Sequence, residues 1–196
     1  MIWTAIVPLK QGAYVKSRLS ERLTETQRQR LSVWMAEQVI AALNAAESVG
    51  RVLLVSETAG LAGEYDWFPA PGRGLNQDLE LARQSLLKGP YLIVHGDLPL
   101  LAADDIEALT DAAERSGCAI APDQAGSGTN ALAIRDDMSF PLQFGEESFS
   151  RHAACAPAGW CCVQRPGLSL DVDSPEDLEA ALSSPKGPAI GFLLLS

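Results

Sequence analysis

Short apolar runs alternate with longer segments of helical periodicity along most of this 196-residue chain, and this alternation limits the fold more than any other feature. Strands that alternate with helices are typical of a mostly parallel sheet with right-handed crossover connections. We therefore expect an α/β fold in a single domain, residues 1–184, with helices on both faces of the sheet and a C-terminal tail, residues 185–196. The expected strands are residues 2–8, 51–56, 65–68, 91–95, 118–122, 131–134 and 160–165.

The longest helix is expected after Thr24, which fits a capping box with Gln27 and is followed by apolar residues at helical spacing. This helix should cover one face of the sheet. A last helix should follow Ser174, with Pro175 at its first position. The other expected helices are residues 76 to about 87, residues 104–115 and a helix with Ser148 near its amino end.

The net charge and the cysteines limit which molecules this chain is expected to bind and where it is expected to occur. The formal net charge of -10 at pH 7 argues against nucleic acid, whose phosphates are bound mainly by lysine and arginine. It does not argue against a nucleotide, because a small site is governed by its local cations and by any bound metal. The four cysteines lack a C-x-x-C pattern, so we expect reduced thiols and a cytoplasmic location; they are Cys118, Cys155, Cys161 and Cys162.

No signal peptide is recognised, and no apolar run approaches the roughly 18 residues that a membrane span requires. We therefore expect no membrane contact. The apolar tail, residues 189–196, is expected to pack on the domain or on a partner subunit, which leaves a homodimer open.

Three aspartates follow apolar runs in a way that suggests a metal site. Asp97 comes just after the run 91–95, where a strand would leave its sheet, and ligands bind at such strand ends in open α/β sheets. Asp171 and Asp173 are two residues apart, so in an extended segment both carboxylates point to one side. Such oxygen ligands suit Mg²⁺. Without Asp97, a solvated turn or an N-cap arrangement would explain the pair better.

A basic loop follows the first strand and contains Lys10, Lys16 and Arg18 around Gly12. Two ammonium groups and one guanidinium suit a polyphosphate. A basic loop in isolation is usually just solvated, and the acids expected at the same sheet edge favour phosphate binding.

Gly74 and Asn76 precede or begin a helix, and they are candidates for nucleotide binding. Gly74 lets the backbone approach a ligand, and the Asn76 amide offers a donor and an acceptor to a base edge. A plain N-cap explains Asn76 equally well. The loop lacks the spacing of a dinucleotide site and of a P-loop.

Two segments are candidates for holding a small anion. The loop 126–130 offers amides and hydroxyls, including that of Thr129, although a tight turn would need its glycines equally. Ser148 lies near a helix amino end, where free N–H groups favour a carboxylate or phosphate. His152 is more often a packed or solvated helix histidine than a catalytic one, and His95 is a candidate for supporting Asp97.

Taken together, these motifs resemble the 2-phospho-L-lactate guanylyltransferase family of coenzyme F420 biosynthesis. The resemblance implies a Rossmannoid fold like that of nucleotide-diphospho-sugar transferases. It also implies Mg²⁺-dependent transfer of GMP from GTP to 2-phospho-L-lactate, phosphoenolpyruvate or 3-phospho-D-glycerate, with release of pyrophosphate. It covers residues 2–182 in order, and the motifs that carry it are residues 5–10, 13–19, 74–76, 96–100, 128–132, 144–145, 148–149, 151–152 and 170–178.

Position by position, the resemblance implies metal ligands at Asp97, Asp171 and Asp173. It implies triphosphate binding by Lys10, Lys16 and Arg18, catalytic roles for these three and Asp97, and an acceptor pocket at Thr129, Gly145 and Ser148. Gln11–Gly12 and His95–Gly96 depart from the family pattern, which bears on loop geometry and acceptor choice.

Two other classes of function compete with this interpretation. Another nucleotidyltransferase, with a sugar phosphate or molybdopterin acceptor, would share the acids and the fold but should need a larger acceptor pocket. A non-catalytic GTP-binding module would bind GTP without releasing pyrophosphate.

Overall fold

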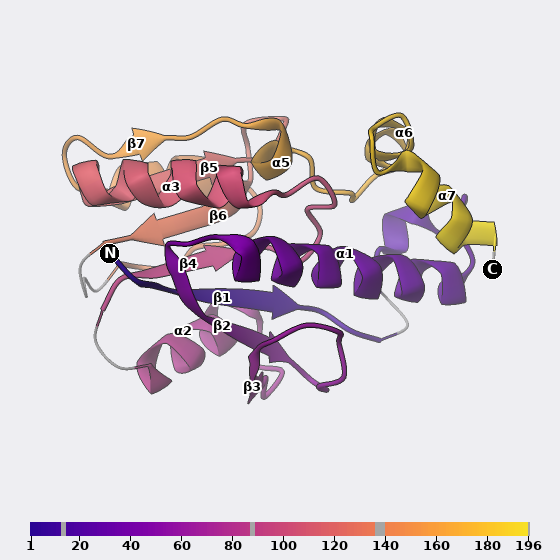
Figure 1. Ribbon diagram of the computed structural model, residues 1–196, viewed down its shortest axis with the longest axis horizontal. Helices are drawn as coiled ribbons and strands as arrows, with labels where there is room; N and C mark the ends of the chain where they lie inside the picture. Colours follow the sequence, from indigo (N-terminus) through magenta and orange to yellow (C-terminus); the bar gives the residue numbers. More distant parts are fainter. Residues whose placement is uncertain (13–14, 87–88, 136–139, 196) are drawn as a thin grey trace.

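A seven-stranded sheet forms the centre of the computed structural model, which describes residues 1–12, 15–86, 89–135 and 140–195. Its strand order is β3-β2-β1-β4-β6-β5-β7 (Figure 1). The expected α/β fold is confirmed. The strands are β1 (Trp3–Leu9), β2 (Val49–Ser56), β3 (Asp66–Pro69), β4 (Tyr91–Val94), β5 (Cys118–Pro122), β6 (Thr129–Ile134) and β7 (Cys161–Cys162).

The sheet is mostly parallel, as predicted, with one reversed strand. β1 pairs in parallel with β2 and β4, and β2 does so with β3. β6 is antiparallel to both β4 and β5, whereas β7 is parallel to β5. The reversal follows from chain length: a short connection can join only antiparallel neighbours, and β5 and β6 are joined by the loop 123–128.

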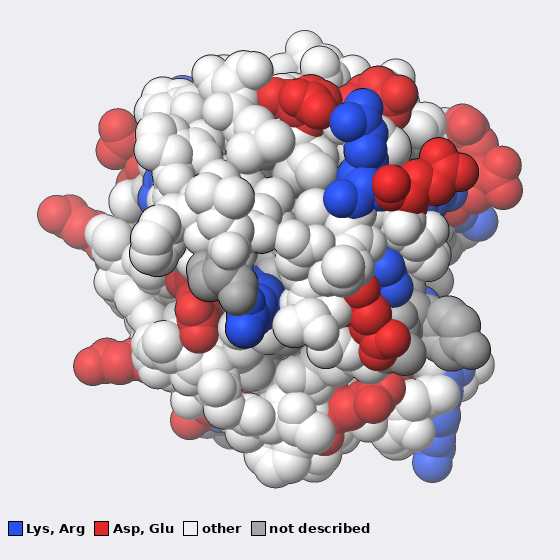
Figure 2. Space-filling view, turned by 90° about the vertical axis from the view of Figure 1, so that its right-hand side faces the viewer, with Lys and Arg blue, Asp and Glu red and all other residues white. Residues whose placement is uncertain are grey.

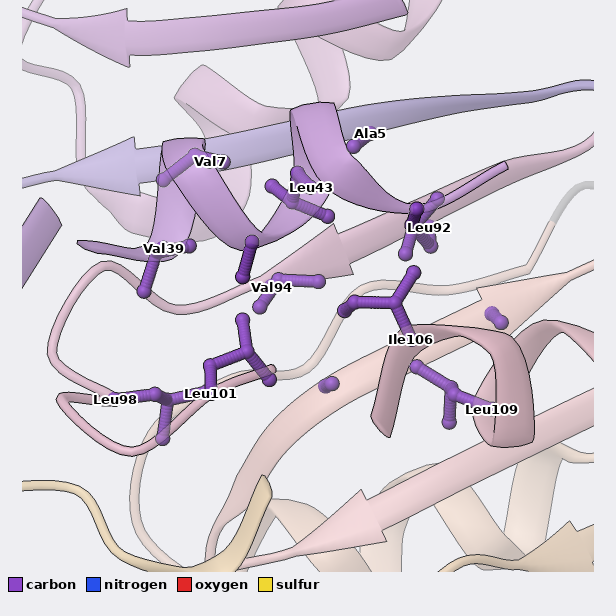
Figure 3. Close-up of a cluster of buried hydrophobic side chains, with 14 of the residues drawn as sticks. Ala5, Val7, Val39, Leu43, Leu92, Val94, Leu98, Leu101, Ile106 and Leu109 are labelled. Atoms are coloured by element: carbon purple, nitrogen blue, oxygen red, sulfur yellow. The ribbon is translucent and has the colours of Figure 1, made fainter. Parts of the chain in front are cut away.

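Helices cover both faces of the sheet, which confirms the prediction. One face packs against α1 (Glu25–Ala45) and α3 (Ala103–Ser116), and the other against α2 (Leu75–Ser85) and the region of α4 (Ser148–Cys155). In Figure 3, Val39 and Leu43 of α1 point toward the strands on the first face. Each fully buried aliphatic side chain of this kind contributes about 1.5–3 kcal/mol.

The C-terminal third ends in three short helices, α5 (Pro166–Ser169), α6 (Pro175–Leu182) and α7 (Gly187–Leu195). Ile190 of α7 is buried in a cluster with Leu31 and Met35 of α1 and Leu178 of α6. The expectation that the tail packs on the domain is therefore confirmed for this helix. Among the described residues, every helix is too short or too polar to cross a membrane.

Most element boundaries agree with the sequence within two residues. The main difference is the predicted strand 160–165, of which only β7 pairs as a strand; Pro166, which lacks an N–H, then begins α5. The basic loop contains a short 3-10 helix, η1 (Ser17–Leu19). The predicted end of α2 at residue 87 and the motif positions 13–14 lie outside the described residues.

Candidate active site

A cavity of about 450 Å³ opens at the carboxyl ends of β1 and β4. Segments from distant parts of the chain line it, and they bring together nine of the eleven predicted site residues. Figure 2 views the end of the molecule toward which β1 points and shows basic and acidic side chains close together, with no continuous patch of either sign. The nine residues are Lys10, Lys16, Arg18, Asp97, Thr129, Gly145, Ser148, Asp171 and Asp173.

Lys16 is the central cation of this cavity. Its Nζ donates to Oδ2 of Asp97 at 2.6 Å and to Oδ1 of Asp173 at 3.0 Å, and only 6% of its side chain is exposed. Burial lowers the pKa of the Lys16 ammonium, but the two carboxylates outweigh burial and raise that pKa above its ordinary value. The side chain is therefore charged at neutral pH.

The backbone of Lys16 is also unusual, with φ 51° and ψ 41°, the left-handed region. A residue with a Cβ adopts this region at a cost of about 1–3 kcal/mol, and such conformations cluster at functional sites. Arg18, two residues further on in η1, reaches Oδ2 of Asp173 at 3.5 Å while its side chain is 76% exposed. The loop thus presents one buried and one exposed cation to the same carboxylate.

A backbone hydrogen bond joins the two acidic segments. The N–H of Val172 donates to the carbonyl oxygen of Asp97 at 3.1 Å, so the 171–173 segment lies beside the end of β4. Oδ1 of Asp171 accepts a hydrogen bond from Nδ2 of Asn130 at 3.0 Å. Burial, followed by the negative charge of Asp97, raises the pKa of Asp171 to about 6.

The acidic groups fit a hard cation by the chemistry of their donor atoms. Oδ1 of Asp97 is buried and has no hydrogen-bond partner among the described residues. Burial and, second to it, the negative charge of Asp97 raise the pKa of Asp171, and a bound cation would favour its ionised form. In the described part of the chain, no three acidic, histidine or cysteine groups are close enough to hold a metal as they stand. The Lys16 ammonium contacts both Asp97 and Asp173 instead.

Another part of the cavity lining, around Thr129 and Ser148, offers neutral hydrogen-bonding groups. Ser148 is the first residue of α4 and is 1% exposed, and its hydroxyl has no partner among the residues that the structure describes. The loop before Thr129 is held by Asp123, whose carboxylate accepts from the N–H groups of Ser127 and Gly128. A Cβ on Gly128 would lie 2.6 Å from Oδ2 of Asp123, so a side chain there would displace the carboxylate that holds the loop.

Gly74 and Asn76 are the two predicted site residues that do not line the cavity, although Leu75 between them does. Gly74 is the N-cap of α2 with φ 112°, a conformation that favours glycine, so the alternative of Asn76 as the N-cap is wrong. Both polar atoms of the Asn76 side-chain amide form hydrogen bonds with the backbone of Phe144. Its Nδ2 donates to the carbonyl of Phe144 at 3.0 Å, and its Oδ1 accepts from the N–H of Phe144 at 2.8 Å.

Several residues around the cavity have partners that sequence reasoning missed. Asn130 donates a hydrogen bond to the carboxylate of Asp171. Its position next to the apolar run 131–134 could have indicated that its amide is placed at the end of a strand. His95 lines the cavity and packs on Phe144, with ring centroids 5.0 Å apart, and burial lowers the pKa of its imidazole. Gln11, which departs from the family pattern, accepts hydrogen bonds from the N–H and hydroxyl of Thr58 and so anchors the basic loop.

Comparison with known proteins points to one kind of chemistry. Residues 3–184 match the family described as "Guanylyl transferase CofC like". The chain is 40% identical to phosphoenolpyruvate guanylyltransferase of Sphaerobacter thermophilus, over 91% of this chain and 92% of that protein. It is 38% identical to the protein of the same name from Rubrobacter xylanophilus, over 89% and 90%.

Solved structures share this fold. The crystal structure of a putative nucleotide-diphospho-sugar transferase from Desulfovibrio desulfuricans G20 superposes with a TM-score of 0.70. The superposition covers 98% of this chain and 93% of that one at 15% identity. The expected resemblance to nucleotide-diphospho-sugar transferases is therefore confirmed at the level of the fold.

Proposed function

This chain belongs to the CofC-like guanylyl transferase family and is a nucleotidyltransferase, and from that premise we propose that it transfers GMP from GTP to phosphoenolpyruvate and releases pyrophosphate. The relatives at 38–40% identity are named for this acceptor. 2-Phospho-L-lactate and 3-phospho-D-glycerate are the alternative acceptors, and in each case the product would serve coenzyme F420 biosynthesis.

The observation that carries this proposal is the meeting of opposite charges in one cavity. Asp97, Asp171 and Asp173 line the same cavity as Lys10, Lys16 and Arg18. A nucleotidyl transfer brings two anions together, and it needs positive charge at the phosphates and oxygen ligands for a metal. The neutral hydrogen-bonding groups of Thr129 and Ser148, which line the same cavity, suit the acid acceptor.

No nucleophilic side chain is required. A phosphate monoester with a second pKa near 6 is mostly dianionic at pH 7, so its oxygen attacks the α-phosphorus of GTP without a general base. The protein's task is to orient this oxygen in line with the leaving pyrophosphate and to stabilise the charge that develops.

Asp97, Asp171 and Asp173 would hold Mg²⁺, as their donor atoms fit it. The ion would neutralise phosphate charge and template the in-line geometry. Lys10, Lys16 and Arg18 would contact the triphosphate and stabilise the pyrophosphate as it leaves. We assign Lys10, Lys16, Arg18 and Asp97 to the catalytic group.

The remaining assignments concern the two substrates. Thr129, Gly145 and Ser148 would hold the carboxylate and phosphate of the acceptor. Gly74 and Asn76 would contribute to the nucleotide site through the start of α2, because Leu75 between them lines the cavity. The four described cysteines are free thiols, which supports a cytoplasmic location.

A pyrophosphate-release assay with GTP and Mg²⁺ tests the proposal. Phosphoenolpyruvate, 2-phospho-L-lactate and 3-phospho-D-glycerate are supplied in parallel, and ATP and CTP replace GTP as controls. We expect turnover with GTP and phosphoenolpyruvate. Turnover only with a sugar phosphate would show a different nucleotidyltransferase, and GTP binding without pyrophosphate release under any acceptor would show a binding module.

A further inference from the structure

His152 of α4 is held in one orientation by contacts on every side of its ring. The side chain is fully buried, and its Nε2 accepts a hydrogen bond from the backbone N–H of Gln143 at 2.9 Å. Phe140 and Phe144 pack on the ring with centroid distances of 5.8 and 4.8 Å. Its Nδ1 lies 3.0 Å from Oγ1 of Thr129. The ring therefore links the 143 backbone to the cavity wall.

These contacts determine the tautomer of the ring. A backbone N–H can only donate, so Nε2 of His152 must be the nitrogen without hydrogen. Burial, with the charge of Arg151 as a second cause, lowers the pKa of His152 to about 4, so the ring is neutral at pH 7. A neutral imidazole has one N–H, and here it must be on Nδ1.

The tautomer in turn orients the hydroxyl of Thr129. Because Nδ1–H of His152 donates to Oγ1, the hydroxyl proton of Thr129 must point elsewhere. Thr129 is 2% exposed and lines the cavity, and within the described ranges its hydroxyl has no second partner. With the other tautomer, Thr129 would donate to the ring and present only lone pairs to a ligand, which would repel an anion.

We propose that His152 is a positioning residue that presents the Thr129 hydroxyl as a hydrogen-bond donor to an anionic oxygen of the acid acceptor. The inference rests on the proposed function and assigns a role to a residue that does not line the cavity itself. His152 neither takes nor gives a proton in the reaction. It acts through Thr129 alone, and the Gln143 N–H selects the tautomer.

The tautomer is measured directly, without any activity assay. In the full-length protein labelled with ¹⁵N-histidine, long-range ¹H–¹⁵N correlation at pH 7 distinguishes the two ring nitrogens. The chain has two histidines, so loss of one set of signals in His152→Asn assigns the spectrum. We expect hydrogen on Nδ1 of His152. Hydrogen on Nε2 would overturn the proposal.

Two matched variants then distinguish the effect of the hydrogen bond that His152 donates to Thr129 from the effect of losing the packed ring. Asn places its amide N–H near the position of Nδ1 and keeps the donor to Thr129, whereas Gln places its carbonyl near Nε2 and keeps only the acceptor for Gln143. Both variants lose the ring. We expect His152→Gln to raise the KM for phosphoenolpyruvate about tenfold or more, the scale of one hydrogen bond to a charged group. The KM for GTP should not change, and His152→Asn should stay within about threefold of the wild type.

A Thr129→Val background provides the decisive comparison, because it removes the hydroxyl that His152 is proposed to orient. In this background, His152→Gln should raise the KM for phosphoenolpyruvate no further. An equal effect of His152→Gln with and without the hydroxyl, or equal effects of Gln and Asn in the wild type, would show a merely structural role. If the wild-type protein releases no pyrophosphate with any of the three acids, the proposed function fails, and the tautomer experiment still decides how the hydroxyl is oriented.

Discussion

Nζ of Lys16 lies 2.6 Å from Oδ2 of Asp97, although the two residues are 81 positions apart in the chain. This ion pair joins the loop after β1 to the segment after β4, at the edge of the sheet where both strands end. The Lys16 ammonium and burial act in opposite directions on the pKa of Asp97: burial raises it, and Lys16, followed by His95, lowers it below its ordinary value. Asp97 is therefore ionised and able to bind a cation at neutral pH.

Removing either of two acids should abolish most of the activity. Asp97→Ala or Asp173→Ala is expected to raise the barrier by about 3 kcal/mol or more, the scale of one preorganised electrostatic group. This corresponds to a loss of roughly 100-fold or more in kcat/KM for GTP at saturating Mg²⁺.

Asp104→Ala is the matched control for that loss, because Asp104 is an exposed aspartate in the first turn of α3. It should keep normal turnover. Near-normal turnover of both Asp97→Ala and Asp173→Ala would show that the proposed metal assignment is wrong.

Lys16→Met should destabilise the metal-free protein and enlarge its response to Mg²⁺. Without the ammonium, Asp97 and Asp173 face each other's charge across a partly desolvated cavity, which we expect to lower the free energy of unfolding by about 1–3 kcal/mol. Mg²⁺ alone should then raise Tm more in this variant than in the wild type, because the cation no longer competes with Lys16.

Arg18→Met serves as the control for Lys16→Met in both thermal-shift and turnover measurements. Arg18 contacts the same Asp173 carboxylate but is 76% exposed, so its loss should change the free energy of unfolding far less. It should still slow the transfer if the guanidinium contacts the triphosphate. Equal Mg²⁺ responses in the wild type and Lys16→Met would contradict competition between the ammonium and the metal.

Asn76→Asp should lower the free energy of unfolding by about 1–3 kcal/mol. The variant replaces the Nδ2 donor by an oxygen that faces the carbonyl of Phe144, so one of the two hydrogen bonds of this partly buried link between α2 and residue 144 is lost. Denaturant unfolding measures the change. Gln77→Ala, at an exposed neighbouring position of the same helix, should have little effect.

The KM for GTP tests the proposed nucleotide role of Asn76 separately. An Asn76→Asp variant that is destabilised but has an unchanged KM for GTP would limit this residue to supporting the fold. A raised KM for GTP at a temperature where the variant is fully folded would support a contact with the nucleotide site.

Acid should destabilise the protein in part through His152. The folded-state pKa of this imidazole is lowered to about 4 from the ordinary 6.5, chiefly by burial. Below about pH 6.5 the unfolded chain takes up a proton that the folded chain does not, so stability is lost as the pH falls from 6.5 to 4. The loss is roughly 3 kcal/mol at 1.36 kcal/mol per pKa unit.

Comparing the pH dependence of unfolding in the wild type and His152→Asn isolates this contribution. Asp171 acts in the opposite direction, because its pKa is raised to about 6 and its protonation on acidification stabilises the fold. Asp171 is present in both proteins, so the difference between the two curves belongs to His152. Parallel curves between pH 4 and 6.5 would mean that the buried imidazole titrates normally.

Most of the architecture followed from local pattern. Apolar runs predicted all seven strands, and the capping box of Thr24 and Gln27 begins α1 where it was expected. The location of Asp97 after β4, and of the basic loop after β1, followed from the rule that parallel strands end at one edge. The reversed direction of β6 could have been inferred from the short loop before it, and it was not.

What the sequence by itself determined was therefore the set of elements, the mostly parallel sheet and the edge at which the charged residues gather, because periodicity and strand direction are properties of adjacent residues. The tertiary structure alone decided which partner each polar side chain takes. Asn76 meets Phe144 and His152 meets Thr129 across 68 and 23 positions of sequence, and Lys16 joins Asp97 and Asp173. Such pairings depend on how packed elements orient side chains to within a hydrogen-bond length, and no local pattern encodes that geometry.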